Sequence, residues 1–136
     1  LLMRESEAEA RGIKPIARIV AHATQSQHPS EFTIAPVGAI ENLFKKTGWT
    51  KDDVDLFEIN EAFASVVLKF LKDTGVDWNQ VNVNGGAMAL GHPIGATGGM
   101  LIGTLLDELE RQDKSTGLIA MCTGGGMGTA TIIGRV

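Results

Sequence analysis

The sequence lacks the features that mark several large classes of protein. It has one cysteine in 136 residues, so it can form no internal disulfide, which favours a reducing compartment. A net charge of -4 leaves no basic surface for nucleic acid or for an anionic membrane. No apolar run approaches the roughly 20 residues of a transmembrane helix. A Walker lysine and a Gly-x-Gly-x-x-Gly fingerprint after a strand are also missing, which argues against the common nucleotide-binding loops.

Glycine, in contrast, is abundant and clustered. Most of the 17 glycines lie in two segments, residues 82–99 around His92 and residues 122–128 directly after the apolar run 118–121. Glycine permits tight backbone paths and exposes N–H groups, which are the donors that stabilise an oxyanion. His92 and the single cysteine, Cys122, are each placed where a strand is expected to give way to a glycine turn. Asn60 and Glu61 follow a third apolar segment in the same way, so the three sites together suggest acyl-transfer chemistry on thioesters.

Each of these residues also has a plainer interpretation. A lone cysteine is more often buried filler than a catalyst. His92, which precedes a proline, could be a loop residue or could position a phosphate beside a glycine-rich helix start. Asn60 could simply cap the helix that follows it. All three are expected at the carboxyl ends of strands, where ligand sites of parallel sheets gather, and this joint placement favours a functional site.

Hydrophobic periodicity predicts strands alternating with helices. The expected strands are residues 16–24, 54–59, 81–83, 118–122 and 129–136, the expected helices are residues 4–11, 36–48, 62–71 and 95–111, and residues 25–33 are expected to form a polar loop. This alternation predicts an α/β fold with a mixed, mostly parallel sheet and helices on both faces, in which the last two strands form an antiparallel pair.

Two of the expected helices have unusual surfaces. The helix 62–71 is apolar nearly all round, which is typical of a helix buried on more than one side. The helix 95–111 carries Gly95, Gly99 and Gly103 at four-residue spacing, although each glycine in a helix interior costs about 0.5–1 kcal/mol relative to alanine. We therefore expect another backbone to approach these glycines closely, with the helix sandwiched between sheets and a partner domain present.

The three motifs together resemble a known family. Asn60-Glu61-Ala62-Phe63-Ala64, the segment around Gly91-His92-Pro93 and Cys122-Thr123-Gly124-Gly125-Gly126 resemble the C-terminal signatures of the thiolases, that is, the acetyl-CoA acetyltransferases and 3-ketoacyl-CoA thiolases. The resemblance extends from about Lys14 to the end of the chain. It implies that residues 1–136 are the C-terminal domain of a thiolase-like half, with the N-terminal half and the loop domain outside this sequence.

The resemblance also implies roles for single residues. Cys122 would be a general acid/base, which requires a thiol pKa near the operating pH. His92 would activate the family's nucleophilic cysteine and donate to the thioester oxygen, while Asn60 would hold a water in that oxyanion hole. The backbone N–H of Gly124 would serve a second oxyanion hole. The expected walls of the acyl site are Phe63, Met88 and Met127, and Glu61 would support the site from behind.

The same resemblance implies the chemistry and the partners. Coenzyme A thioesters would be the substrates, either in a Claisen condensation of acetyl-CoA or in thiolytic cleavage of a 3-ketoacyl-CoA, with no cofactor and no metal. The acyl-carrying cysteine belongs to the N-terminal half and has no counterpart here, so the chain alone is expected to be inactive. That half would be its partner in a homo-oligomer, a dimer or a tetramer, located in the cytoplasm, with mitochondria and peroxisomes as alternatives. A second interpretation is a binding or assembly module that uses the fold without chemistry.

Overall fold

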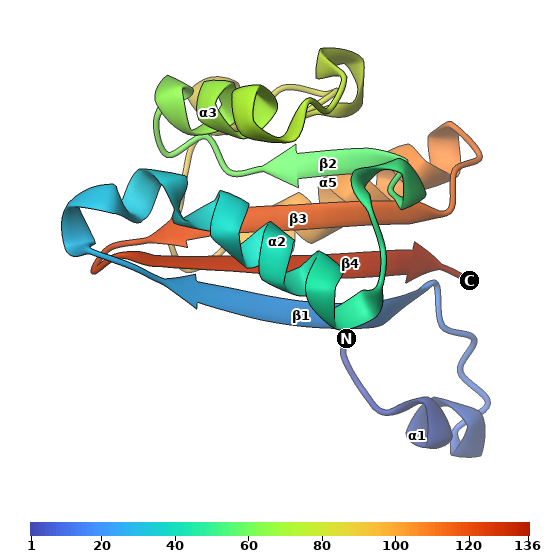
Figure 1. Ribbon diagram of the computed structural model, residues 1–136. Helices are drawn as coiled ribbons and strands as arrows, with labels where there is room; N and C mark the ends of the chain where they lie inside the picture. The colour runs from blue at the N-terminus through green and yellow to red at the C-terminus, as the bar shows by residue number, and fades with distance from the viewer.

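A four-stranded sheet with helices on both faces forms the centre of the molecule in the computed structural model, which describes residues 1–136 (Figure 1). The strands are β1 (Ala17–Ser26), β2 (Leu56–Ile59), β3 (Thr116–Thr123) and β4 (Met127–Arg135), in the spatial order β1-β4-β3-β2. The helices are α1 (Glu5–Ala10), α2 (Ala35–Thr47), α3 (Ala64–Thr74), α4 (Ala87–Leu90) and α5 (Thr97–Arg111). Short 3-10 turns span Pro29–Ile34, Lys51–Asp53 and Trp78–Gln80.

The sheet is mixed but mostly antiparallel, so the prediction of a mostly parallel sheet is wrong. β4 runs antiparallel to both β3 and β1, and only β2 and β3 are parallel. The expected antiparallel pair at the end of the chain is confirmed, because Cys122 pairs with Gly128 across a short glycine turn. Such a turn is too short for the crossover that parallel strands need. The long β1 then adds to the free edge of β4, again antiparallel, which reverses the balance of the sheet.

The strand expected at residues 81–83 does not form. A single parallel bridge joins Val81 to Phe57, and Asn82 then turns the chain with a φ of 47°. The Asn82 side chain takes over the pairing, because its Oδ1 accepts the Ile59 N–H at 2.7 Å and its Nδ2 donates to the Ile59 carbonyl at 2.9 Å. A side-chain amide thus satisfies the end of β2 in place of a neighbouring strand.

The two faces of the sheet carry separate apolar cores, which confirms helices on both faces. Alternate side chains of one strand point to opposite faces. Figure 1 shows α2 in front of the sheet and α5 behind it. The core under α2 and α3 includes Phe57, Leu118, Ile132, Ile40, Leu43, Val66 and Phe70. The core under α5 includes Leu56, Ile119, Ile133, Leu101, Leu105 and Leu109.

The outer sides of two helices are more open than expected. In α3 the residues Val66, Val67 and Phe70 are buried, but Leu68 is 57% exposed, so burial on more than one side is wrong for this chain. No atom lies within 4 Å of the position a Cβ would take at Gly95, Gly99 or Gly103. The expected close backbone is therefore absent within this chain, and α5 packs on one sheet face only.

Residues 25–33 do not form the single polar loop that the sequence predicted, because β1 continues to Ser26 and a 3-10 turn follows it.

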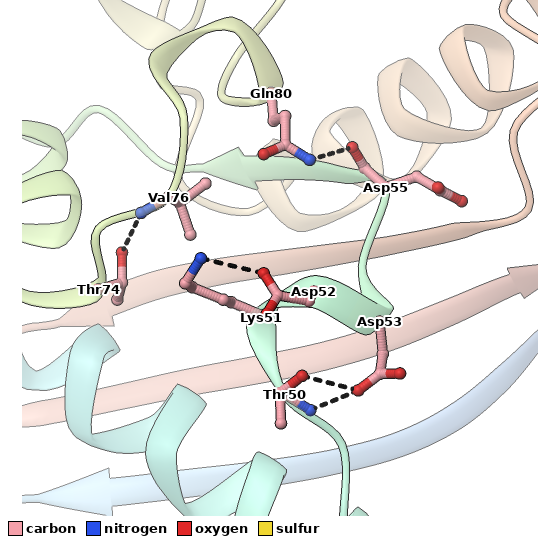
Figure 2. A network of polar contacts seen from close by, with 8 residues as sticks. All are labelled: Thr50, Lys51, Asp52, Asp53, Asp55, Thr74, Val76 and Gln80. Atoms are coloured by element: carbon pink, nitrogen blue, oxygen red, sulfur yellow. Dashed lines mark hydrogen bonds and ion pairs between the residues drawn. The ribbon is translucent and has the colours of Figure 1, made fainter.

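Hydrogen bonds in the connections hold β2 in place beside β3. Figure 2 shows the turn before β2, where the Asp53 carboxylate accepts from the Thr50 N–H at 2.7 Å and from its hydroxyl at 2.9 Å. In the same view Gln80 donates to the Asp55 carbonyl at 3.2 Å. The Asp55 carboxylate accepts the Thr116 N–H at the start of β3, which fixes the two strands side by side.

Candidate active site

Asn60 and His92 meet at the carboxyl end of β2. The Asn60 N–H donates to the Ala120 carbonyl of β3 at 2.9 Å, which places the residue directly beyond the last pair of the parallel ladder. His92 lies in the loop that leads into α5, and its Nε2 is 3.4 Å from Asn60 Nδ2. Asn60 is buried, with 1% of its surface exposed. The structure therefore brings together two of the residues that the sequence predicted.

Thr97, which the sequence analysis did not select, sets the orientation of the histidine. Its hydroxyl lies 2.7 Å from His92 Nδ1 and donates its proton to the Pro93 carbonyl at 3.0 Å. Because that proton is committed, the hydroxyl must accept from Nδ1–H, and the neutral ring then carries no proton on Nε2. Nε2 is thus an acceptor that faces Asn60 Nδ2 and a possible proton acceptor in catalysis. The spacing of the two residues in the sequence does not predict this contact, because it is the fold of the loop before α5 that brings His92 back to Thr97.

The Asn60 amide is only half satisfied by the chain. Nδ2 faces the histidine, whereas Oδ1 is a buried side-chain atom without a hydrogen-bond partner in the protein. Buried polar atoms nearly always have a partner, which can be protein, water or a ligand. The unpartnered oxygen marks this position as one that a further molecule completes.

Glu61 fixes the start of α4, which carries Met88. One carboxylate oxygen accepts the Met88 N–H at 2.9 Å, and the other accepts from Asn82 Nδ2 at 3.2 Å. A Cβ at Gly86 would collide with the Glu61 side chain, which would have to shift and give up these contacts. The supporting role predicted for Glu61 stays a prediction, and these contacts are the means by which it would act.

Cys122 lies at the same end of the sheet as Asn60, without touching it. Ala120, whose carbonyl binds the Asn60 N–H, precedes it by two residues in β3. The thiol is half-buried and forms no hydrogen bond with His92, whose ring nitrogens contact Thr97 and Asn60. Burial raises the pKa of the Cys122 thiol above its ordinary value, an effect that a backbone hydrogen bond only partly offsets. No positive charge is among the influences on this pKa, and the acid/base role remains a prediction.

The glycine turn after Cys122 is held firmly at its far end. Gly126 has a φ of 92°, and a Cβ there would collide with the Gln27 carbonyl. The Gln27 N–H donates to the Gly126 carbonyl at 2.8 Å, which ties the turn to the end of β1. Gly124, in contrast, has open space around it. Its backbone N–H is thus presented from an anchored turn, and its oxyanion role stays a prediction.

The three predicted wall residues are all exposed in this chain. Phe63 is 54% exposed, Met88 66% and Met127 44%. The Phe63 ring packs edge-on against Phe32, with ring centroids 6.2 Å apart, a contact that the sequence did not suggest. Exposed apolar side chains are available to a ligand or to another protein surface, and their role toward an acyl group stays a prediction.

Glu58 is a second residue that the sequence analysis passed over. It lies in β2 two residues before Asn60, so strand alternation puts both on the α5 side of the sheet, and only 2% of its surface is exposed. Burial, then the nearby carboxylates of Glu61 and Glu108, raise its pKa to about 7. A usable signal was present, because an acidic residue in the middle of an apolar strand is unusual.

One further hollow of the surface lies away from this site. This hollow, of about 550 Å³, lies at the opposite end of the sheet and is lined among others by Lys14, Asp107 and Arg135. No group of three or more His, Cys, Asp or Glu residues is arranged to hold a metal ion. Every helix is too short or too polar to cross a membrane.

Comparison with known proteins identifies what this geometry is similar to. Residues 13–135 match the family model described as "Thiolase, C-terminal domain". The chain is 47% identical over 135 residues to "Acetyl-CoA acetyltransferase, cytosolic" of Mus musculus, covering 99% of this chain and 34% of the mouse protein. The acetyl-CoA acetyltransferase structure from Bacillus anthracis matches with a TM-score of 0.94 and 40% identity, covering 98% of this chain and 34% of that one. An Ascaris suum thiolase, Acat5, in complex with coenzyme A matches with a TM-score of 0.91, 38% identity and the same coverage. The chain thus spans about a third of the length of these relatives.

Proposed function

The chain belongs to the thiolase family, as its C-terminal domain, and from this premise we propose that it supplies half of an active site for acyl transfer between coenzyme A thioesters. The reaction is a Claisen condensation of acetyl-CoA or the reverse, thiolytic cleavage of a 3-ketoacyl-CoA. The observation that carries the proposal is the buried Asn60 amide set against His92, whose tautomer Thr97 fixes. Coenzyme A bound to the related Ascaris suum thiolase supports the substrate class.

His92 acts on the nucleophile in this proposal. Its unprotonated Nε2 takes the proton of a cysteine thiol that comes from outside this chain, and the resulting thiolate attacks the thioester carbonyl. The C–S bond to coenzyme A breaks, the acyl group stays on the cysteine, and the coenzyme A thiolate leaves and takes a proton from solvent, so that the ring keeps its own. The protonated ring then donates through Nε2–H to the thioester oxygen of the second substrate. Asn60 holds a water beside it, so that two donors face the developing negative charge. The contact between Asn60 Nδ2 and His92 Nε2, 3.4 Å long, supports a shared position for these donors.

Cys122 and Gly124 serve the second half-reaction. Cys122 removes a proton from the α-carbon of acetyl-CoA in condensation, or returns one in cleavage, while the Gly124 N–H binds the adjacent oxyanion. Burial raises the thiol pKa in this chain, so efficient proton transfer near neutral pH requires a compensating positive charge. Protonated His92 and groups of the partner half are the sources of that charge. Both residues lie at the end of β3 that adjoins Asn60, which supports a common cleft.

The partner half docks on the open side of α5. That side presents Gly99 and Gly103 with free space above them, and Met100 is 38% exposed beside them. Small residues on a helix permit close approach by another backbone, which offsets the cost of glycine in a helix. The partner half carries the nucleophilic cysteine, and the complete enzyme assembles as a homo-oligomer. The cytosolic mouse relative supports a cytoplasmic location.

A chimeric enzyme tests this proposal. The chain replaces the corresponding third of the mouse acetyl-CoA acetyltransferase, with which it shares 47% identity, and thiolysis of acetoacetyl-CoA is measured. We expect turnover in the ordinary range, about 1–10³ per second, and a loss of about 100-fold or more in His92→Ala. His22→Ala is the matched control, since that histidine contacts Thr131 on the exposed sheet surface and should leave the rate unchanged. Equal rates in the two variants, both folded by circular dichroism, would exclude the assigned role of His92.

A further inference from the structure

A small cavity lies beside Asn60 on the α5 side of β2. Its volume is about 20 Å³, and its lining includes Glu58, Asn60, Thr97 and the loop glycines Gly85 and Gly86. A buried water needs roughly 10–15 Å³ of such space and two to four polar partners. The cavity therefore has room for one water.

Two polar groups in this lining need a partner. The Glu58 carboxyl group is buried, and neither a hydrogen bond nor a positive charge is among the influences on its pKa. The Asn60 Oδ1 also lacks a donor, and it is the one fully enclosed side-chain atom without a partner, whereas the Glu58 oxygens keep a small accessible surface. Leaving a buried polar group unsatisfied costs about 1–3 kcal/mol. One water between the two groups would satisfy both.

The charges around Glu58 decide which form of its carboxyl group makes this contact. Glu61, in the loop after β2, and Glu108, on α5, are the charged groups that act on it, and both are carboxylates. The Glu108 charge is compensated by its own contacts with Arg111, Gln112 and Asn84, so no cation is left to pair with Glu58. The proton therefore stays on Glu58 up to about neutral pH, and the group acts as a hydrogen-bond donor.

We propose that Glu58 is a positioning residue, whose neutral carboxyl group donates to one buried water that in turn donates to Asn60 Oδ1 and so holds Asn60 Nδ2 toward His92. The inference rests on the proposed function, because it gives Asn60 a part in the reaction. If the Asn60 amide flipped by a half-turn, its Oδ1 would face the unprotonated His92 Nε2, and two hydrogen-bond acceptors would oppose each other. This water lies on the Oδ1 side of the amide and is separate from the one that Asn60 holds toward the substrate.

Two substitutions of matched size separate this role from simple packing. Glu58→Gln keeps a donor in the cavity, whereas Glu58→Met fills the same volume without one. Crystal structures and ¹⁵N spectra of the full 136-residue chain are compared for the wild type and both variants. We expect a water within hydrogen-bond distance of Glu58 and Asn60 Oδ1 in the wild type and in Glu58→Gln. In Glu58→Met we expect that water to be lost and the Asn60 amide to flip or to take two orientations. The ¹⁵N chemical shifts of the His92 ring should change as a result. Glu110→Met, which alters an exposed carboxyl group of α5 outside the cavity lining, is the control and should leave His92 unchanged.

The same variants in the complete thiolase give the functional readout. Glu58→Met should lower kcat about tenfold with little change in KM, and Glu58→Gln should stay within about threefold of the wild type. A water absent from the cavity, an unmoved Asn60 amide in Glu58→Met, or equal damage from Gln and Met would overturn the proposal. If the water and the amide behave as expected but kcat does not respond, Glu58 does not position a reacting group and the proposal fails. If His92→Ala leaves the rate of the complete thiolase unchanged, the proposed function is refuted instead. The structural comparison of the Glu58 variants does not depend on that result, so the two failures can be told apart.

Discussion

At the scale of single residues, the state of His92 depends on one hydroxyl group. Thr97→Val keeps the shape of the side chain but removes the acceptor of the Nδ1–H bond. We expect the ring to lose its fixed tautomer and kcat/KM for thiolysis to fall about tenfold or more, because Nε2 is no longer held as the proton acceptor. Thr97→Ser should retain most activity. Identical rates in Thr97→Val and the wild type would contradict this assignment, and ¹⁵N shifts of the ring report the tautomer directly.

Glu58 links the stability of the fold to pH. Its pKa is raised from 4.5 to about 7, so the folded state binds more protons than the unfolded state between these values. The contribution is fully present below about pH 4.5 and is lost as pH rises through 7, by roughly 3 kcal/mol at most. Urea unfolding at pH 5 and pH 8 should therefore show a smaller decline for Glu58→Gln than for the wild type. The same decline in both proteins would mean that Glu58 is already ionised at pH 5.

Cys122 should affect only one half-reaction. In the complete thiolase, Cys122→Ser should keep acylation of the nucleophile and lose most of the condensation rate. The serine hydroxyl has a much higher pKa than a thiol, while its size barely disturbs the packing. His92→Ala should damage acylation as well, because it serves both half-reactions. Single-turnover acylation and steady-state condensation, measured on the same preparations, distinguish these outcomes, and equal loss of both steps in Cys122→Ser would remove its separate role.

The sequence pointed to Asn60 and His92 but not to the residues that hold them. Their motifs are local, with an asparagine directly after an apolar strand and a histidine within a glycine-rich segment. Thr97 was missed because its partner is reached only through the turn of the loop before α5. Glu58 was overlooked although its position inside an apolar strand was a visible signal, since only the packing of α5 shows that it shares a cavity with Asn60.

At the scale of elements, the local pattern predicted helices and strands well and their pairing poorly. The helix that ends at Gly48 was predictable because Gly48 takes the left-handed conformation, with a φ of 76°. Strand direction depends on partners far away in the sequence, and β1 pairs with β4 at the other end of the chain. The short strand at 81–83 failed because Asn82 pairs through its side chain, a possibility that hydrophobic periodicity does not register.

The turn between β3 and β4 offers a direct test of close packing. A Cβ at Gly128 would collide with the backbone of Ala35 at the start of α2, whereas Gly124 has nothing within 4 Å, and neither residue has a positive φ. Gly128→Ala should therefore destabilise the fold by about 1–3 kcal/mol, because backbone must move to admit the methyl group. Gly124→Ala, in the turn just before β4, is the control and should change the free energy of unfolding by less than about 0.5 kcal/mol. Similar values for the two variants in urea unfolding would show that α2 does not press on the turn.

At the scale of the whole molecule, several exposed apolar side chains belong to the candidate site. Phe63, Met88 and Met127 are exposed, and the outer side of α5 has space above Gly99 and Gly103. The chain buries part of each sheet face under its helices and yet leaves these side chains of the candidate site uncovered. The relatives, about three times as long, have further sequence with which to cover such surfaces. In the proposed function, this site is one side of a cleft whose other side comes from the remainder of a thiolase.

The most direct test is the thiolysis of acetoacetyl-CoA by the 136-residue chain alone, measured beside the chimera that adds the rest of a thiolase. The chain holds His92, Asn60 and Cys122 but not the cysteine that would carry the acyl group in the proposed mechanism. We predict no thiolysis above background for the chain alone and turnover of about 1–10³ per second for the chimera. Turnover in that range by the chain alone, persisting through rigorous purification, would contradict the division of the active site between two halves.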